Sequence, residues 1–169
     1  MTRKLYFPYL DVIRFFAALA IFIGHGFLAW KAYFAANHGL DVSPYIKNLM
    51  INTGLGVECF FYLSGFLITY ILLKEKETTG RINIFNFFIR RAIRIWPLYF
   101  LLILLTPILI SWLDKAPPHY ISNLLFVGNF DIIWNGKAHF PFSHFWSIAI
   151  EEQFYLIWPF IIAFIPRKR

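Results

Sequence analysis

Cysteine and acidic residues are scarce in this sequence of 169 residues. The single cysteine, Cys59, leaves no second thiol for an internal disulfide, and no spaced set of Cys and His residues indicates a zinc site. Only 9 Asp and Glu residues stand against 16 Lys and Arg residues, which gives a formal net charge of +7. A basic balance can indicate nucleic-acid binding. Here the basic residues avoid the long apolar stretches and collect at their ends, so we expect a membrane partner and no nucleic acid.

The composition is strongly apolar. Apolar residues make up 59% of the chain and aromatic residues 21%, whereas about 45 to 50% apolar residues is usual in soluble domains. The mean hydropathy of +0.60 points the same way. Because this composition excludes a disordered or low-complexity chain, we expect an all-α integral membrane protein whose apolar surface lies in the lipid bilayer.

Four stretches have the length of about 18 to 25 residues that a helix needs to cross the hydrocarbon core. We expect these spans at residues 9–33, 55–73, 95–112 and 147–165. The first can also be read as a secretory signal peptide, because two basic residues precede an apolar run. Asp11 and Arg14 inside that run argue against cleavage. A further apolar stretch at 120–134 is too short to cross, and it predicts an interfacial or re-entrant segment.

The positions of the basic residues predict the orientation. Eleven lie before the first span, between the second and third spans, or after the fourth: Arg3, Lys4, Lys74, Lys76, Arg81, Arg90, Arg91, Arg94, Arg167, Lys168 and Arg169. The opposite side holds four: Lys31, Lys47, Lys115 and Lys137. Since positive charge favours the cytoplasmic side, we expect both termini and a loop at 74–94 in the cytoplasm. The outer segments are then 34–54 and 113–146.

Arg14 and His25 are functional candidates, because ionisable residues inside a membrane span are costly. They lie eleven residues apart, which places them about 20° apart around a helix and roughly 16 Å apart along it. The two side chains therefore lie on the same face of the predicted helix, at two different depths in the membrane. The structural alternative is an Arg14 paired with Asp11 and a His25 bonded to a neighbouring helix.

Carboxylates occur near the predicted outer ends of the second and fourth spans. Glu58 belongs to a stripe at helical spacing that also suits close packing through small residues: Gly54, Glu58, Tyr62, Gly65 and Thr69. Glu151 and Glu152 lie near the start of the fourth span. A carboxylate from Glu58 or Glu151 can fix the tautomer of His25 and support it as a general base. The same residue types suit a proton or cation path, so the alternative is a small multispanning transporter or channel subunit.

Arg90, Arg91 and Arg94 lie in the predicted cytoplasmic loop, just before Trp96 and Pro97 open the third span. Three guanidinium groups at this spacing can bind phosphates bidentately. Anchoring by the positive-inside rule explains the same residues equally well.

Histidines in the outer segments have no metal-ligand spacing. We expect His38, His119 and His139 to be solvated, and we predict no metal site.

Four segments match, in order, the motifs of a known family. They are Leu10–Leu19 followed by His25, then Gly56–Thr69, Phe88–Pro97 and His144–Tyr155. The first holds an Arg and a His separated by ten residues, and the second a phenylalanine-rich Ser-Gly-Phe-Leu run. The third holds an arginine-rich run leading into Pro, and the fourth Trp-Ser-Ile with Glu-Glu-Gln-Phe-Tyr, where Ile148 replaces a Leu. The sequence thereby resembles the membrane-bound acyltransferase family 3.

This resemblance implies a larger helical bundle, of which residues 1–169 look like the N-terminal part. It also implies transfer of an acyl group, commonly acetyl from acyl-CoA, to a hydroxyl of an extracytoplasmic carbohydrate or other cell-envelope acceptor. The expected location is the bacterial inner membrane. Together with the residue layout, the resemblance predicts catalytic roles for His25, Glu58 and Glu151. The predicted substrate-binding residues are Arg14, Arg90, Arg91, Arg94 and Glu152. We expect acyl-CoA as a co-substrate and no cofactor.

Overall fold

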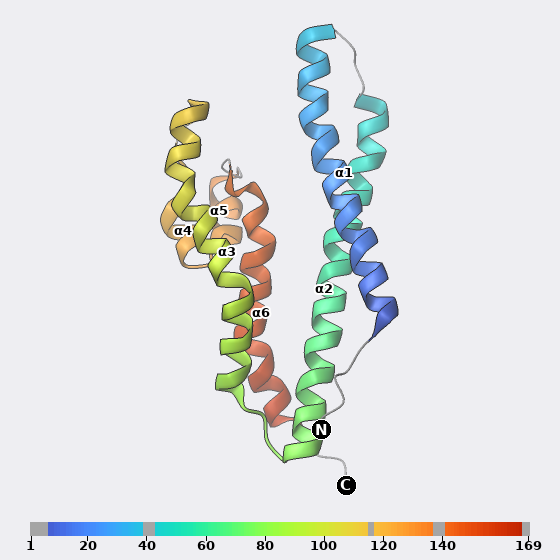
Figure 1. Cartoon of the computed structure of the whole chain (residues 1–169), viewed down its shortest axis with the longest axis vertical. Helices are drawn as coiled ribbons and strands as arrows, with labels where there is room; N and C mark the ends of the chain where they lie inside the picture. Colours follow the sequence, from blue (N-terminus) through green and yellow to red (C-terminus); the bar gives the residue numbers. More distant parts are fainter. Residues whose placement is uncertain (1–6, 39–42, 115–116, 137–140, 167–169) are drawn as a thin grey trace. The chain divides into compact units, whose positions relative to one another are not determined.

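The computed structural model describes residues 7–38, 43–114, 117–136 and 141–166, and only the backbone of residues 8, 27–38 and 43–53. Within these ranges every regular element is a helix (Figure 1). The elements are α1 (Pro8–His38), α2 (Ser43–Thr79), α3 (Ile84–Leu113), α4 (Tyr120–Leu124), α5 (Gly128–Asn135), the 3-10 helix η1 (Phe142–His144) and α6 (Phe145–Phe164). They form two compact units, Met1–Ile68 (unit 1) and Thr69–Arg169 (unit 2). Each unit is described by itself.

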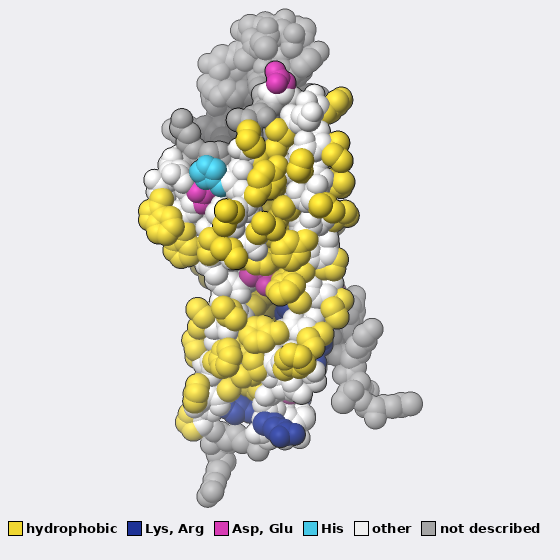
Figure 2. All heavy atoms as spheres, turned by 90° about the vertical axis from the view of Figure 1, so that its left-hand side faces the viewer, with side chains coloured by type: hydrophobic (Ala, Val, Ile, Leu, Met, Phe, Trp, Pro, Cys, Tyr) yellow, Lys and Arg dark blue, Asp and Glu magenta, His cyan; other side chains and the backbone are white. Residues whose placement is uncertain are grey.

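Among the described residues, four helical stretches are long and apolar enough to cross a membrane. They are Tyr9–Gly26, Gly54–Thr79, Ile84–Leu113 and Phe142–Phe164. Figure 2 shows hydrophobic side chains over much of the visible face, with Lys and Arg side chains near its lower end. Helices suit lipid because they satisfy their own backbone hydrogen bonds. The prediction of an all-α integral membrane protein with four spans is therefore confirmed.

Helix α3 begins at Ile84, so the predicted loop at 74–94 is wrong. The side chain of Asn83 caps this start by accepting a hydrogen bond from the backbone N–H of Asn86 at 3.0 Å. The backbone N–H of Asn83 in turn donates to Glu75 Oε1 at 2.9 Å. Hydropathy missed this start because arginines lower the local hydropathy without ending the helix.

The two segments that the sequence predicts on the outer side are also more helical than expected. At 34–54, α1 continues to His38 and α2 begins at Ser43. The segment at 113–146 contains α4 and α5, of 5 and 8 residues. Both helices are too short to cross a membrane, as expected for this stretch.

In unit 1, α1 and α2 approach closely at Gly56. A Cβ added to Gly56 would lie 2.9 Å from Ile21 Cγ1 and 3.0 Å from the carbonyl oxygen of Ala17. A Cβ on Gly54 or Gly65 would meet no heavy atom outside its own helical turns within 4 Å. The close approach therefore uses Gly56, which lies about 200° around the helix from Gly54. Close packing through the small residues of the predicted stripe stays a prediction.

In unit 2, aromatic packing joins α3 to η1 and α6. The buried cluster consists of Tyr99, Ile103, Phe142 and Phe145. The hydroxyl of Tyr99 donates to the carbonyl oxygen of Asn123 at 2.7 Å. A buried tyrosine hydroxyl needs such a partner. This bond therefore ties α4 to the α3 core.

The last turns of α2 are tied to α6. Trp158 Nε1 donates to Thr69 Oγ1 at 2.7 Å. The ammonium of Lys76 donates to three backbone carbonyls at the end of α6: Ile162 (2.9 Å), Ala163 (2.6 Å) and Ile165 (2.7 Å). The last carbonyls of a helix have no partner within the helix, and a cation is favourable at that end. Lys76 therefore caps α6 from the neighbouring helix.

Candidate functional site

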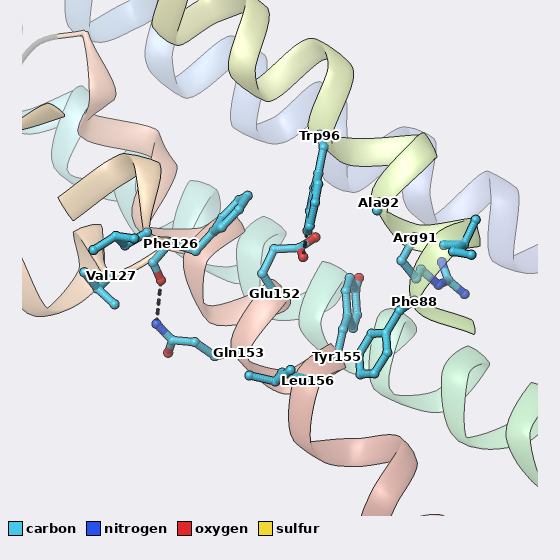
Figure 3. Close-up of a pocket in the computed structure, with 12 residues that line it drawn as sticks. Phe88, Arg91, Ala92, Trp96, Phe126, Val127, Glu152, Gln153, Tyr155 and Leu156 are labelled. Atoms are coloured by element: carbon cyan, nitrogen blue, oxygen red, sulfur yellow. Dashed lines mark hydrogen bonds between the residues drawn. The ribbon is translucent and has the colours of Figure 1, made fainter. Parts of the chain in front are cut away.

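A cavity of about 560 Å³ lies in unit 2, between α3, α6 and the turn that joins α4 to α5 (Figure 3). Its lining includes Phe88, Arg91, Trp96, Phe126, Glu152 and Tyr155. Small-molecule sites commonly have volumes of about 300 to 1,000 Å³ and a mostly apolar lining with a few polar groups. Two of the predicted substrate-binding residues, Arg91 and Glu152, meet in this cavity.

Glu152 has one hydrogen-bonded oxygen and one unpartnered oxygen. Trp96 Nε1 donates to Glu152 Oε2 at 3.2 Å. Glu152 Oε1 is buried and has no hydrogen-bond partner among the described residues. Leaving a buried acceptor unsatisfied costs free energy, so such an atom calls for a functional explanation. Glu152 can accept a hydrogen bond or a proton from a molecule bound in the cavity.

Arg91 is held against aromatic rings. Its guanidinium carbon lies 5.6 Å from the ring centroid of Phe87 and 5.6 Å from that of Tyr155. The hydroxyl of Tyr155 donates to Glu151 Oε2 at 3.1 Å. Cation–π contacts hold a guanidinium group in place. Arg91 therefore brings a positioned cation to the cavity, where its charge also acts on Glu152.

The α4–α5 turn forms the remaining wall through a strained residue. Phe126 has φ 54°, a left-handed conformation that costs a residue other than glycine about 1 to 3 kcal/mol. Its carbonyl oxygen accepts a bond of 2.8 Å from Gln153 Nε2, drawn in Figure 3. The side-chain amides of Gln153 and Asn129 also form two hydrogen bonds with each other, of 2.9 and 3.2 Å. The Phe126 ring stacks on Tyr99 with centroids 4.5 Å apart. These contacts hold this wall of the cavity in place.

The other predicted arginines of this region lie outside the cavity lining. Arg90, Arg91 and Arg94 are on α3, not in a loop. Arg90 NH2 lies 3.7 Å from Glu75 Oε2 in an ion pair whose arginine side chain is 57% exposed. Arg94 is exposed on the same helix. Phosphate binding by these residues stays a prediction.

The predicted catalytic residues fall in different units. Arg14 and His25 share the continuous helix α1, as expected, and His25 is partly buried. Arg14 NH1 lies 3.5 Å from Asp11 Oδ1, which is the ion pair of the structural alternative. Glu58 is exposed on α2 in unit 1, whereas Glu151 belongs to unit 2. Assistance of His25 by either carboxylate stays a prediction.

The side chain of His119 is 51% exposed, as expected for a solvated histidine, but it also pairs with Asp131. Its Nδ1 lies 2.9 Å from Asp131 Oδ1 and 3.1 Å from Oδ2. The hydrogen bond from His119 lowers the pKa of the Asp131 carboxyl below its usual value. The sequence gives no sign of this pair, because α4 and the turn after it separate the two residues along the chain. His38 is the last residue of α1 and its side chain is outside the described part, as is the whole of His139.

Several residues at the cavity have no individual role that the sequence predicts. Trp96 marks the predicted start of the third span, Tyr155 lies inside a segment that carries the family resemblance, and Phe126 and Asn129 lie inside the predicted interfacial stretch. The one sequence feature that points to them is their position next to predicted site residues, because Trp96 follows the arginine run and Gln153 follows Glu152. Across the described ranges, no group of three or more His, Cys, Asp or Glu side chains is arranged to hold a metal ion.

This geometry defines a class of protein: an all-α membrane protein with a preformed cavity that is lined by a guanidinium group and a carboxylate. The sequence matches the acyltransferase-domain family over residues 7–169, so the chain belongs to that family. The family resemblance seen in the sequence is thereby confirmed.

Relatives of this chain include named O-acetyltransferases. It is 33% identical over 176 aligned positions to the O-acetyltransferase OatA of Staphylococcus aureus (strain NCTC 8325 / PS 47). The alignment covers 98% of this chain and 26% of OatA. The chain is 32% identical over 170 positions to the putative peptidoglycan O-acetyltransferase YrhL of Bacillus subtilis (strain 168), covering 94% of this chain and 24% of YrhL. The chain thus spans about a quarter of the length of these curated relatives. No solved structure matches it.

Proposed function

We propose that this chain is the N-terminal part of a membrane O-acetyltransferase. The enzyme would move an acetyl group from acyl-CoA to a hydroxyl of an extracytoplasmic, cell-envelope carbohydrate. The names of the relatives support acetyl as the group and, for YrhL, peptidoglycan as an acceptor. The observation that carries the proposal is the unit 2 cavity, which Arg91 and Glu152 both line and where one buried Glu152 oxygen has no partner among the described residues.

Arginines bind the acyl donor in this proposed enzyme. Coenzyme A carries several phosphate charges, and charge-assisted hydrogen bonds from arginine are about twice as strong as neutral ones. Arg91 binds the coenzyme A phosphates at the cavity. Arg90 and Arg94 on the same helix, together with Arg14, supply further positive charge for these phosphates. Glu152 Oε1 accepts a hydrogen bond from an amide N–H of the donor's flexible arm.

His25 is the proposed general base on the acceptor side. It takes the proton of the acceptor hydroxyl while the oxygen attacks the thioester carbonyl. The new C–O bond forms, the C–S bond breaks, and coenzyme A leaves as the thiol. A carboxylate from Glu58 or Glu151 orients the imidazole. Arg14 cannot act as this base because a guanidinium stays protonated at neutral pH.

We also propose the bacterial inner membrane as the location, with both termini in the cytoplasm. Glu77 and Asp114 are exposed near opposite ends of a span and suit single-cysteine labelling after Cys59→Ser. Impermeant reagent added outside intact cells should label a cysteine at position 114 and leave one at position 77 unlabelled. Labelling of both from the same side contradicts the orientation.

The function is tested with membranes that carry the chain and with a chimera in which residues 7–169 replace the matching segment of OatA. Radiolabelled acetyl-CoA is supplied, and label in envelope carbohydrate is measured. The proposal predicts acetylated carbohydrate from the chimera. A chimera that inserts to the level of OatA but transfers no label overturns the proposal. Ion or solute flux without acetyl transfer supports the transporter alternative instead.

A further inference from the structure

His119 and Asp131 form a pair of titratable groups outside the cavity described above. His119 precedes α4 and Asp131 lies on α5, with Nδ1 2.9 Å from Oδ1. The carboxylate also accepts bonds from Asn135 Nδ2 at 2.6 Å and from Ser122 Oγ at 3.3 Å. The His119 side chain is 51% exposed and that of Asp131 is 13% exposed. Three donors therefore fix the direction in which a largely covered carboxylate points.

A pocket of about 430 Å³ opens beside this pair. Its polar lining comes from His119, Ser122 and Asp131, and Tyr120 contributes an aromatic ring. Apolar side chains of Ile121, Leu125 and Val127 complete the lining. A few convergent polar groups in a mostly apolar hollow of this size are typical of a small-molecule site.

The chemistry of the lining favours a neutral, hydroxyl-rich ligand. The carboxylate of Asp131 disfavours an anion such as a phosphate, because like charges repel. A sugar hydroxyl can donate to that carboxylate or to the oxygen of Ser122, whose own hydrogen is given to Asp131 or to the carbonyl oxygen of His119. The ring of Tyr120 offers an apolar surface next to a polar edge, which suits the C–H face of a sugar ring.

We propose that this pocket is an acceptor subsite that binds a neutral carbohydrate. Asp131 and Ser122 bond the sugar hydroxyls, Tyr120 packs against the sugar ring, and His119 acts as a positioning residue that holds the carboxylate. This inference rests on the proposed function, in which the acceptor is a carbohydrate. In the proposed orientation the end of α3 at Leu113 is on the outer side. The pocket follows it directly in the chain, where an extracytoplasmic acceptor would arrive.

The test uses the chain in lipid nanodiscs with ¹³C-labelled histidine and chitotetraose, a neutral N-acetylglucosamine oligomer, as the probe. Ring signals are assigned with His119→Gln and His144→Gln. Chitotetraose should shift the His119 ring signal in a saturable manner and leave that of His144, which is exposed on η1 outside the pocket, in place. Inorganic phosphate should shift neither. An unmoved His119 signal at high probe concentration, or an equal shift by phosphate, overturns the inference.

Two variants separate binding from a merely structural role of the pair. Asp131→Asn should weaken chitotetraose binding about tenfold, which matches loss of a hydrogen bond to a charged group. Ile121→Trp keeps the pair intact and fills the pocket from a position that is 75% exposed, so it should weaken binding to the same extent without unfolding α4 or α5. His144→Gln should bind within twofold of the unaltered chain. Unchanged affinity in both pocket variants overturns the subsite.

The acetyl-transfer assay keeps this inference distinct from the proposed function. A chimera that transfers acetyl while chitotetraose fails to bind at His119 overturns the subsite alone. Saturable binding at His119 in a chain whose chimera transfers no acetyl overturns the proposed function and leaves the carbohydrate site standing.

Discussion

The indole N–H of Trp96 donates to Glu152 Oε2 at 3.2 Å, across 56 residues of sequence. The bond joins α3 to α6 at the cavity and leaves Glu152 Oε1 as a buried acceptor. The carboxylate therefore has one oxygen engaged by the fold and one turned to no protein donor among the described residues. This is the arrangement expected where a protein holds a polar group for a ligand.

Trp96→Phe should destabilise unit 2 by about 1 to 3 kcal/mol, because it removes the donor and leaves Glu152 without its bond. The free energy of unfolding is measured in detergent micelles. Trp112→Phe is the matched control on the same helix, since Trp112 is 80% exposed. An equal loss of stability in both variants would show that the Trp96–Glu152 bond contributes nothing.

Arg91→Gln should raise the KM for acetyl-CoA about tenfold or more in the chimera. A hydrogen bond to a charged group contributes about 1.5 to 3 kcal/mol, and each 1.4 kcal/mol is about tenfold. Arg81→Gln is the control, because Arg81 is exposed in the α2–α3 turn and lies outside the cavity lining. KM should change less than twofold in the control. An unchanged KM in a well-inserted Arg91→Gln chimera leaves only an anchoring role for Arg91.

Gly56→Ala should separate α1 from α2. The new Cβ would lie 2.9 Å from Ile21 Cγ1 and 3.0 Å from the Ala17 carbonyl oxygen, and a backbone atom cannot yield as a side chain can. We expect a loss of about 1 to 3 kcal/mol in stability, as for other overpacked sites. Gly54→Ala, at an open position, should be neutral or stabilising. Thermal unfolding of the two variants compares them directly, and equal midpoints would refute the close contact at Gly56.

The Asp131 carboxyl should give the α4–α5 region an acid-sensitive step. Because the hydrogen bond from His119 lowers its folded pKa, its ionised form stabilises the fold above the unfolded pKa of about 3.9. That contribution is lost as the pH falls through the lower, folded pKa. Hydrogen exchange of the α5 amides, corrected for intrinsic rates, should show weakening protection below about pH 4. Asp131→Asn should remove this step, and an identical acid step in the variant counts against the pair as its cause.

Hydropathy and length are enough to predict the first helix of unit 1. Helical periodicity then places Arg14 and His25 on one face of it, and α1 runs unbroken through both residues. Periodicity could not show that α1 meets α2 at Gly56, since the Ile21 side chain and the Ala17 carbonyl come from another helix. Close approach is a property of tertiary packing.

Unit 2 shows why the candidate site was only partly predictable. Arg91 can be identified from the sequence because three arginines at close spacing suit phosphate binding, and Glu152 because a carboxylate inside a span is costly. The bond from Trp96 to Glu152 could not be predicted, because it depends on how α3 packs on α6. The His119–Asp131 pair could not be predicted for a related reason, since it depends on how α5 folds back against the start of α4. Hydropathy also misplaced the start of α3, because a helix continues through arginines that end an apolar window.

The central claim is tested most directly by acetyl transfer from the chimera with and without His25→Gln. Activity is normalised to folded, inserted protein, so that loss of chemistry is separated from loss of abundance. General-base assistance contributes about 10² to 10⁴ in rate, and glutamine keeps hydrogen-bonding capacity without acting as a base. The account predicts that the unaltered chimera transfers label from acetyl-CoA to envelope carbohydrate and that His25→Gln lowers turnover by about 100-fold or more. Near-unaltered turnover in His25→Gln would contradict it.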